Sequence, residues 1–182
     1  VLRGGLEADD TRWMRESLRS LGLPIAEQAG TWVVDGGARP WASVPLWLGA
    51  SGTTLRFLLP WLALRGRGPV EIRGEARLFE RPLEPLLAPL EHLGARWEPG
   101  GEGGWLHPAP TAPAGFELTV DARLSSQFLT GLALTAASLP AGGVLHWAST
   151  SSASYLELTA RWLAVFGCAS ELSPRTWRIP GG

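Results

Sequence analysis

Hydroxyl, amide and glycine residues gather at two places where a polar turn leads into an apolar run. The first is the turn Gly49–Arg56 (GASGTTLR), and the second contains Ser125, Ser126 and Gln127 (LSSQF). At each place, consecutive backbone N–H groups and the positive end of a helix dipole could bind an anion such as a phosphate. Each could equally be an ordinary helix start, at which a serine side chain accepts a backbone N–H of its own helix.

Two further segments add polar groups of the same kind. The segment STSSASY precedes another helix and holds Ser152 and Tyr155, the single tyrosine of the chain. The segment GEARLFERP carries Arg77 and Arg81, and a planar guanidinium matches the oxygens of a carboxylate or phosphate. A flexible polar loop is the alternative for the first segment. A surface salt bridge is the alternative for either arginine, and it is the interpretation that we favour for Arg81.

The composition excludes several classes of partner. Sixteen basic and seventeen acidic residues nearly cancel, so no overall field would recruit nucleic acid or a membrane. The chain contains no lysine, so any step that requires a lysine ammonium needs another part of a polypeptide. His92, His107 and His146 lack the spacing of metal ligands, and no metal site is predicted.

The single cysteine and the first residues bear on the compartment. Cys168 excludes an internal disulfide and suits a reducing environment, and its apolar neighbours indicate a packing role. The opening residues lack the apolar stretch of a signal peptide. We therefore expect a cytoplasmic protein.

A repeat of about 72 residues organises the chain. Gly22, Gly94 and Gly167 each follow an amphipathic run, and they lie 72 and 73 residues apart. Glycine readily adopts the left-handed conformation that ends a helix. A tryptophan follows each glycine by ten or eleven residues: Trp32, Trp105 and Trp177. Two independent markers with one period predict a structural repeat.

Each full copy is predicted to run strand, helix, strand, helix, strand, strand. The first helices of the second and third copies are expected at residues 51–64 and 125–138. Projecting the period backwards puts the first helix of the first copy before Val1, so this copy is expected to be incomplete. The expected boundaries of the three copies are 1–37 (partial), 38–110 and 111–182.

This order predicts an α/β (α+β) fold in which three βαβαββ units, the first incomplete, are related by pseudo-three-fold symmetry. The helices are expected to pack centrally, with the sheets outside. A solenoid is the main rival architecture, although 72 residues is long for a solenoid repeat and three copies can close on themselves.

The motifs, taken in this order and spacing, resemble the substrate domain of the EPSP synthase (3-phosphoshikimate 1-carboxyvinyltransferase) family. The residues that carry the resemblance are the turn 49–56, the run 74–82, the Ser125-Ser126-Gln127 element, residues 152–155, Thr159 and Phe166-Gly167. The Ser-Ser-Gln element is the most specific of them. The resemblance covers nearly the whole chain as one domain, 1–182, and implies a second, catalytic domain that this chain does not contain.

The resemblance implies roles for eight residues. Those implied to bind shikimate 3-phosphate are Ser125, Ser126, Ser152 and Tyr155. Those implied to contact phosphoenolpyruvate are Gly52, Thr53, Arg77 and Gln127. Gly52 also matches the position at which the family meets the inhibitor glyphosate. The family usually has asparagine at the position of Ala50, and this difference removes one amide from the phosphoenolpyruvate pocket.

The implied reaction transfers the enolpyruvyl group of phosphoenolpyruvate to the 5-hydroxyl of shikimate 3-phosphate, a step towards chorismate and the aromatic amino acids. The family uses no metal or organic cofactor. Its acid/base groups come from the second domain, and its first Lys-Ser motif would fall before Val1, so no catalytic residue is expected in this chain. The alternatives are a UDP-N-acetylglucosamine enolpyruvyl transferase, whose usual reactive cysteine is absent from residues 75–80, and a non-catalytic binding module of the same fold.

Overall fold

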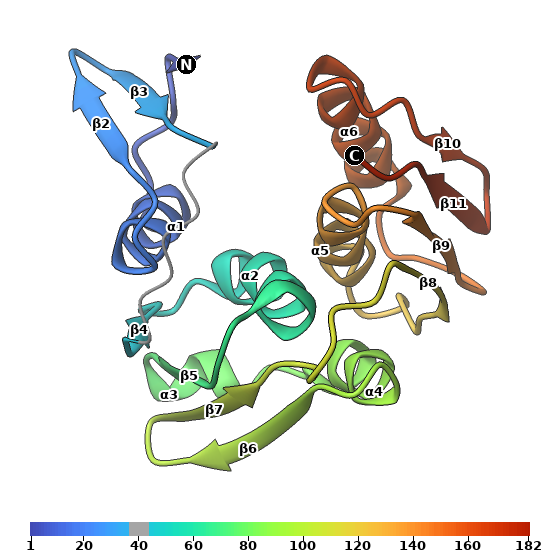
Figure 1. The fold of residues 1–182 in the computed structure, drawn as a ribbon, viewed down its shortest axis with the longest axis horizontal. Helices are drawn as coiled ribbons and strands as arrows, with labels where there is room; N and C mark the ends of the chain where they lie inside the picture. Colours follow the sequence, from blue (N-terminus) through green and yellow to red (C-terminus); the bar gives the residue numbers. More distant parts are fainter. Residues whose placement is uncertain (37–43) are drawn as a thin grey trace.

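The computed structural model describes residues 1–36 and 44–182, and Figure 1 shows their arrangement. The helices are α1 (Asp9–Ser20), α2 (Gly52–Arg65), α3 (Ala76–Phe79), α4 (Glu84–His92), α5 (Gln127–Ala136) and α6 (Ala153–Val165). The strands are β1 (Leu2–Arg3), β2 (Ile25–Gln28), β3 (Thr31–Val34), β4 (Leu46–Trp47), β5 (Val70–Arg73), β6 (Arg96–Gly100), β7 (Gly103–His107), β8 (Gly115–Thr119), β9 (Gly142–His146), β10 (Glu171–Leu172) and β11 (Thr176–Ile179). Within these residues, no helix has the length and apolar character needed to cross a membrane.

The strands form three sheets that share one plan. The second and third sheets have the orders β4-β5-β7-β6 and β8-β9-β11-β10. In both, the first pair is parallel and the other pairs are antiparallel. The first sheet, β1-β3-β2, keeps the antiparallel part of this order. The predicted α/β fold with three related units, of which the first is incomplete, is confirmed.

The three marker glycines end equivalent helices, as predicted. Gly22, Gly94 and Gly167 have φ angles of 97°, 94° and 90°, in the left-handed region. The N–H of the residue after each glycine donates to a carbonyl five residues earlier, at 2.9, 3.1 and 2.8 Å. This hydrogen bond is characteristic of the Schellman motif, which satisfies carbonyl groups that the end of a helix leaves unpaired.

The tryptophan marker holds in only two of the units. Trp32 and Trp177 are buried, whereas Trp105 is 43% exposed. Trp105 follows its glycine by eleven residues instead of ten, and a shift of one residue along a strand moves a side chain to the opposite face. The buried position is taken by Gly104, against which the ring of Trp97 packs. The prediction that Trp105 is equivalent to the other two is wrong.

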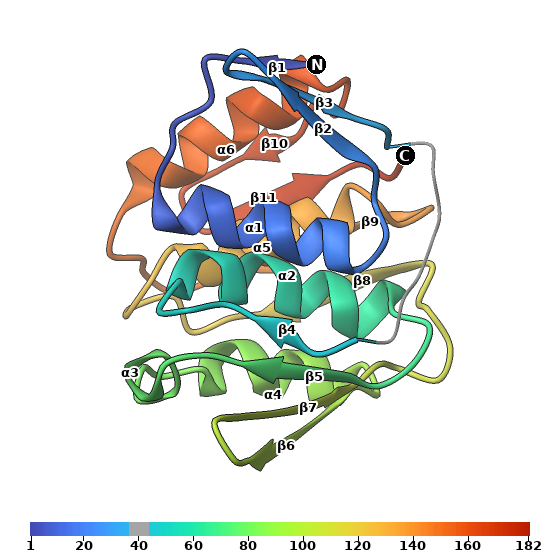
Figure 2. The ribbon, with the colours of Figure 1, turned by 90° about the vertical axis from the view of Figure 1, so that its left-hand side faces the viewer.

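Two helices, α2 and α5, form the centre of the molecule, with the sheets outside them (Figures 1 and 2). Ten of the fourteen residues of α2 and eight of the ten residues of α5 are buried. Helices that are apolar on most sides are expected in a core. The two helices approach closely at Gly131, where a Cβ would overlap the carbonyl oxygen of Arg56.

The predicted bounds of these helices shift by a few residues. The helix expected at 51–64 is α2, and the one expected at 125–138 is the shorter α5. Ser125 and Ser126 therefore precede the helix and do not form its first turn. The predicted boundary between the first and second units, 37/38, falls in residues 37–43, outside the described residues.

Candidate functional site

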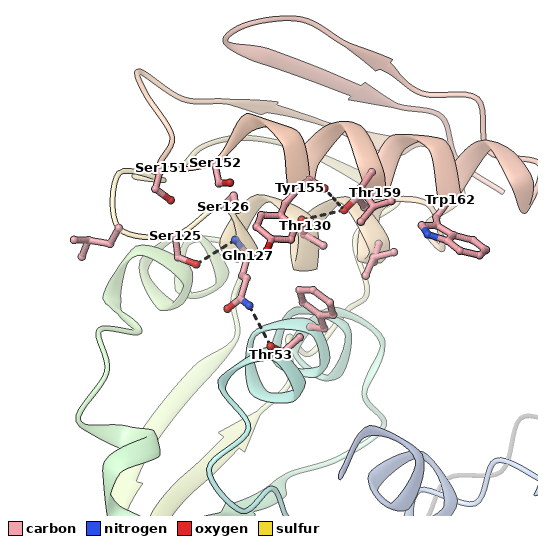
Figure 3. A pocket seen from close by; sticks show the side chains of 14 residues that line it. Thr53, Ser125, Ser126, Gln127, Thr130, Ser151, Ser152, Tyr155, Thr159 and Trp162 are labelled. Carbon is pink, nitrogen blue, oxygen red and sulfur yellow. Dashed lines mark hydrogen bonds between the residues drawn. The ribbon is translucent and has the colours of Figure 1, made fainter. Parts of the chain in front are cut away.

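A cavity of about 690 Å³ opens beside the starts of α2, α5 and α6 (Figure 3). The side chains near the helix starts are polar and include Thr53, Ser125, Ser126, Ser151 and Ser152. Further along the helices the lining becomes apolar, with Phe57, Leu134, Leu158 and Trp162. The cavity therefore has a polar end and an apolar end.

The structure brings six of the eight predicted site residues to this cavity. They are Thr53, Ser125, Ser126, Gln127, Ser152 and Tyr155. Gly52 lies at the first position of α2, next to the cavity wall. Arg77 lies on α3, where its exposed guanidinium forms an ion pair with Glu75 at 3.1 Å. The structure does not bring Arg77 to the cavity.

The hydroxyls at the starts of α5 and α6 do not cap their own helices. Ser126 precedes α5 in a helical conformation (φ −66°, ψ −17°), and its side chain makes no cap hydrogen bond. Ser152 precedes α6 and likewise makes none. Only Ser125 accepts a nearby backbone N–H, that of Gln127, at 3.2 Å. The capping alternative therefore does not describe Ser126, and the side chains of Ser126 and Ser152 both line the cavity (Figure 3).

At the start of α2, by contrast, acceptors from the protein itself occupy the hydrogen-bonding groups. The Ser51 side chain accepts the N–H of Thr54 at 3.1 Å, which is an ordinary N-cap. The hydroxyls of Ser51 and Thr53 both donate to the carboxylate of Asp10, with Thr53 at 3.1 Å. This turn was predicted as a site for an external anion. In the structure a carboxylate of the protein itself, from α1, lies at the helix start, where the dipole favours negative charge.

A chain of hydrogen bonds joins the three units at this point. The side-chain amide of Gln127 donates to Thr53 at 3.1 Å, and Thr53 donates in turn to Asp10. The oxygen of the same amide accepts from Arg56 at 2.8 Å. Asp10 belongs to the first unit, Thr53 and Arg56 to the second, and Gln127 to the third. The amide that was predicted to contact a ligand thus also holds the starts of α2 and α5 together.

Two arginines that the sequence-based site did not include meet beside this chain. A Cβ added at Gly52 would lie 2.7 Å from Nη1 of Arg81 and 3.1 Å from Nη1 of Arg56. Burial lowers the pKa of Arg56, and the neighbouring positive charge of Arg81 lowers it further. Within residues 1–36 and 44–182, neither guanidinium forms an ion pair with a carboxylate. The salt bridge favoured for Arg81 is not formed.

This pair of guanidiniums places two positive charges beside Gly52, at the start of α2. The Nε atom of Arg56 is buried and has no hydrogen-bond partner. Repulsion between two close cations is relieved by an anion between them, so the pair suits a phosphate or carboxylate ligand. A sequence signal did exist, since Arg56 ends the same turn, GASGTTLR, that was singled out as a candidate site.

The remaining candidate chemical groups lie elsewhere. His146 contacts Glu117 at 2.8 Å and Thr176 at 3.3 Å across one sheet, and His107 lies 3.3 Å from Glu98 on another. Burial raises the pKa of the Cys168 thiol, which disfavours the reactive thiolate. Among the described residues, no group of three or more His, Cys, Asp or Glu side chains could hold a metal ion.

A comparison of the chain with known protein families finds a match to one of them. The family model for EPSP synthase (3-phosphoshikimate 1-carboxyvinyltransferase) matches residues 1–182. The chain belongs to the EPSP synthase family. Among curated members, the 3-phosphoshikimate 1-carboxyvinyltransferase of Laribacter hongkongensis is 39% identical over 91% of this chain, and that of Idiomarina loihiensis is 33% identical over 100%.

The fold is also that of solved EPSP synthases. The structure of the enzyme from Acinetobacter baumannii superposes with a TM-score of 0.79 at 23% identity, covering 99% of this chain. The chain spans 40% and 44% of the two curated relatives and 41% of this solved chain.

Proposed function

We propose that this chain forms part of the substrate-binding site of a 3-phosphoshikimate 1-carboxyvinyltransferase. That enzyme transfers the enolpyruvyl group of phosphoenolpyruvate to the 5-hydroxyl of shikimate 3-phosphate. The observation that carries the proposal is the polar end of the cavity, at which side chains from two helix starts converge in a chain of this family. We propose a cytoplasmic location for this enzyme, because a chain with a single cysteine suits a reducing compartment.

Shikimate 3-phosphate is proposed to bind at the starts of α5 and α6. Ser125, Ser126 and Ser152 would donate to its phosphate, and Tyr155 would lie beside its ring. A hydrogen bond to a charged oxygen contributes roughly 1.5–3 kcal/mol. The hydroxyls of Ser126 and Ser152 suit this role because neither is used to cap its helix.

Phosphoenolpyruvate is proposed to bind on the side of Gly52, Thr53 and Gln127. Its phosphate and carboxylate are both anionic, and the guanidiniums of Arg56 and Arg81 beside Gly52 are the cations nearest to this wall. The participation of Arg77, which the family resemblance implies, stays a prediction.

The chemical step requires groups from the rest of the polypeptide. In it the 5-hydroxyl loses its proton as its oxygen adds to the carbon of phosphoenolpyruvate that bears the phosphate, and the methylene group gains a proton to become a methyl group. The methyl group of the tetrahedral intermediate then loses a proton as the bond to phosphate breaks, which restores the double bond and releases phosphate. Fixed arginines stabilise the anionic intermediate most effectively in a site that excludes water. The 182 residues alone are therefore expected to bind anions weakly and to show no turnover, which an assay of the purified chain would check.

Substitution of Ser126 tests the proposed site. In the complete enzyme, Ser126→Ala should weaken shikimate 3-phosphate binding about ten-fold, the equivalent of one lost hydrogen bond to a charged group. The melting temperature should barely change, because this hydroxyl caps nothing. Calorimetric titration beside a thermal melt measures both quantities.

Ser138→Ala provides the matched control at the opposite end of α5. Its hydroxyl donates to the Thr135 carbonyl, away from the cavity, so affinity should be unchanged. Retained affinity together with a clear loss of stability in Ser126→Ala would instead identify Ser126 as a structural residue and contradict the proposed site.

A further inference from the structure

The hydrogen-bond chain beside the cavity has a fixed direction, because its two ends are charged groups of opposite kind. At one end the carboxylate of Asp10 can accept hydrogen bonds but has none to donate, and at the other the guanidinium of Arg56 can donate but not accept. Between these ends lie Thr53 and the side-chain amide of Gln127. The direction of each hydrogen bond in the chain therefore follows from the chemistry of its ends.

The Asp10 end determines what the hydroxyl of Thr53 can do. A threonine hydroxyl has one hydrogen, and Thr53 donates it to Asp10 at 3.1 Å. Towards Gln127 the same hydroxyl can therefore only accept, and it accepts from the amide nitrogen at 3.1 Å (Figure 3). Asp10 thus decides, through Thr53, which end of the Gln127 amide faces α2.

The Arg56 end favours the same orientation of the amide. Nη1 of Arg56 donates to the amide oxygen at 2.8 Å, so a reversed amide would turn its own N–H groups towards this guanidinium. It would also turn its oxygen towards Thr53, whose hydrogen is already given to Asp10. Reversal would lose both hydrogen bonds, and the loss is costly because Arg56 is only 9% exposed and water has little access to replace them.

The fixed orientation leaves a hydrogen-bond donor for a ligand. The amide nitrogen of Gln127 carries two hydrogens, and Thr53 accepts one of them. Within residues 1–36 and 44–182, no side chain or carbonyl accepts the other. Gln127 lines the cavity, so its second N–H is available to an anionic oxygen that binds there.

We propose that Asp10 is a positioning residue for phosphoenolpyruvate: acting through Thr53, it holds the amide of Gln127 with an N–H group directed to an anionic oxygen of this substrate. The inference rests on the proposed function, in which Gln127 contacts phosphoenolpyruvate. It gives the first unit a part in binding, although Asp10 itself does not need to touch the substrate. A purely electrostatic role would act in the opposite direction, because a carboxylate near the site repels an anion.

Two substitutions of Asp10 in the complete enzyme separate positioning from charge. Asp10→Ala removes the acceptor for Thr53 and should raise the KM for phosphoenolpyruvate about ten-fold, the equivalent of one hydrogen bond to a charged oxygen. Asp10→Asn removes the charge but keeps one oxygen for Thr53. Its NH₂ group then meets Ser51, which can accept it because the Ser51 hydroxyl has Thr54 Oγ1 as another acceptor at 2.7 Å. Asp10→Asn should therefore behave like the unsubstituted enzyme. An equal change in the two variants, or a lower KM in both, would overturn the proposal.

The two substrates distinguish positioning from a general loss of structure. Ser126 and Ser152, the proposed ligands of shikimate 3-phosphate, take no part in the hydrogen-bond chain. Asp10→Ala should therefore leave the KM for shikimate 3-phosphate nearly unchanged. A similar rise for both substrates would identify Asp10 as a structural residue and contradict the proposal.

A double-mutant cycle shows whether Asp10 acts through the amide. Gln127→Ala should itself raise the KM for phosphoenolpyruvate, and in that background Asp10→Ala should have no further effect, because the group that it positions is gone. Additive effects would overturn the proposal. If Gln127→Ala raises the KM and Asp10→Ala does not, this inference fails and the proposed function stands. If Gln127→Ala leaves the KM unchanged, the contact in the proposed function fails, and the inference fails with it.

Asp9→Asn is the matched control, since Asp9 is the neighbouring carboxylate and forms an exposed ion pair with Arg12. It should leave the KM for both substrates unchanged, and thermal melts check that every variant is folded at the assay temperature. If Asp10→Ala does not fold, Thr53→Val replaces it in the cycle, because valine removes the hydroxyl at a similar volume. Thr53→Ser keeps the hydroxyl and should keep the KM of the unsubstituted enzyme. Additivity of Thr53→Val with Gln127→Ala would again overturn the proposal.

Discussion

The starts of α2 and α5 occupy equivalent places in two copies of one unit, yet their hydrogen-bonding groups have different partners. At α2, Ser51 caps the helix and Asp10 accepts from two hydroxyls. At α5, Ser126 caps nothing and faces the cavity. The backbone plan is repeated, but the start of α2 binds a carboxylate of the first unit, whereas we propose that the start of α5 binds a ligand.

The physical reason lies in the unpaired N–H groups of a helix start. These groups require acceptors, and the helix dipole adds a preference for negative charge. A carboxylate of the protein meets this demand at α2. At α5 the nearest acceptor is the neutral hydroxyl of Ser125. We therefore expect a phosphate to bind better at α5 than at α2, and the following changes should test this contrast.

The largest effect is expected where the two helices touch. Gly131→Ala places a Cβ on the carbonyl oxygen of Arg56, and neither backbone can move without disturbing the core. The free energy of unfolding should fall by about 3 kcal/mol, the upper part of the usual range for overpacking. Urea unfolding of the variant measures this loss. A Cβ at Gly68 meets no atom within 4 Å, so Gly68→Ala should be nearly neutral, and equal stability of the two variants would refute the close crossing.

Removing the carboxylate at α2 should produce the next largest effect. Asp10→Ala deletes the acceptor for Ser51 and Thr53, and a loss of about 2 kcal/mol in the free energy of unfolding is expected. The variant should also gain stability from inorganic phosphate, which can replace the carboxylate at the helix start. Thermal melts with and without phosphate measure both effects.

The neighbouring Asp9 supplies the control for this comparison. Its side chain is 84% exposed and forms an ion pair with Arg12, so Asp9→Ala should cost little stability. A similar loss in the two variants would mean that Asp10 does not hold the start of α2.

A smaller effect is expected from the cap itself. Ser51→Ala removes the acceptor of the Thr54 N–H and should cost about 1 kcal/mol in the free energy of unfolding. The affinity for shikimate 3-phosphate in the complete enzyme should be largely retained. This pattern is the opposite of that expected for Ser126→Ala, and a melt combined with a titration of both variants compares them directly. If the two serines gave the same pattern, the contrast between the helix starts would fail.

The smallest effect concerns the loop that leads to α5. Hydrogen bonds from the side chain and the backbone N–H of Arg123 hold the pKa of Asp121 at about 2, below its ordinary value of 3.8. Because the folded-state pKa is the lower one, this contact stabilises the fold above about pH 4, and its contribution is lost as the pH falls towards 2. Since both groups are exposed, the effect on overall stability should be slight. NMR titration of Arg123→Gln should show the Asp121 pKa rising towards 3.8, and an unchanged midpoint would contradict the pairing.

Predictions from the sequence were reliable for features that depend on contacts between residues close together in the chain. The helix ends at Gly22, Gly94 and Gly167 depend on hydrogen bonds that span six residues, so each could be predicted from its own segment. The repeat followed from their spacing, and the family resemblance indicated the Ser-Ser-Gln element as a candidate site. The face of Trp105 was mispredicted because a strand alternates with period two, and an offset of one residue is enough to reverse it.

The sequence by itself thus determined the repeated unit, the helix ends and the polar segments that supply the cavity. Tertiary structure alone decided how these segments are used. Asp10 reaches Ser51 and Thr53 across more than 40 residues, and Arg81 meets Arg56 at Gly52 only because α2 and the segment before α4 pack together. Such contacts depend on the distance and direction between side chains of different units. Packing of the three units sets these quantities, and no pattern within one segment encodes them.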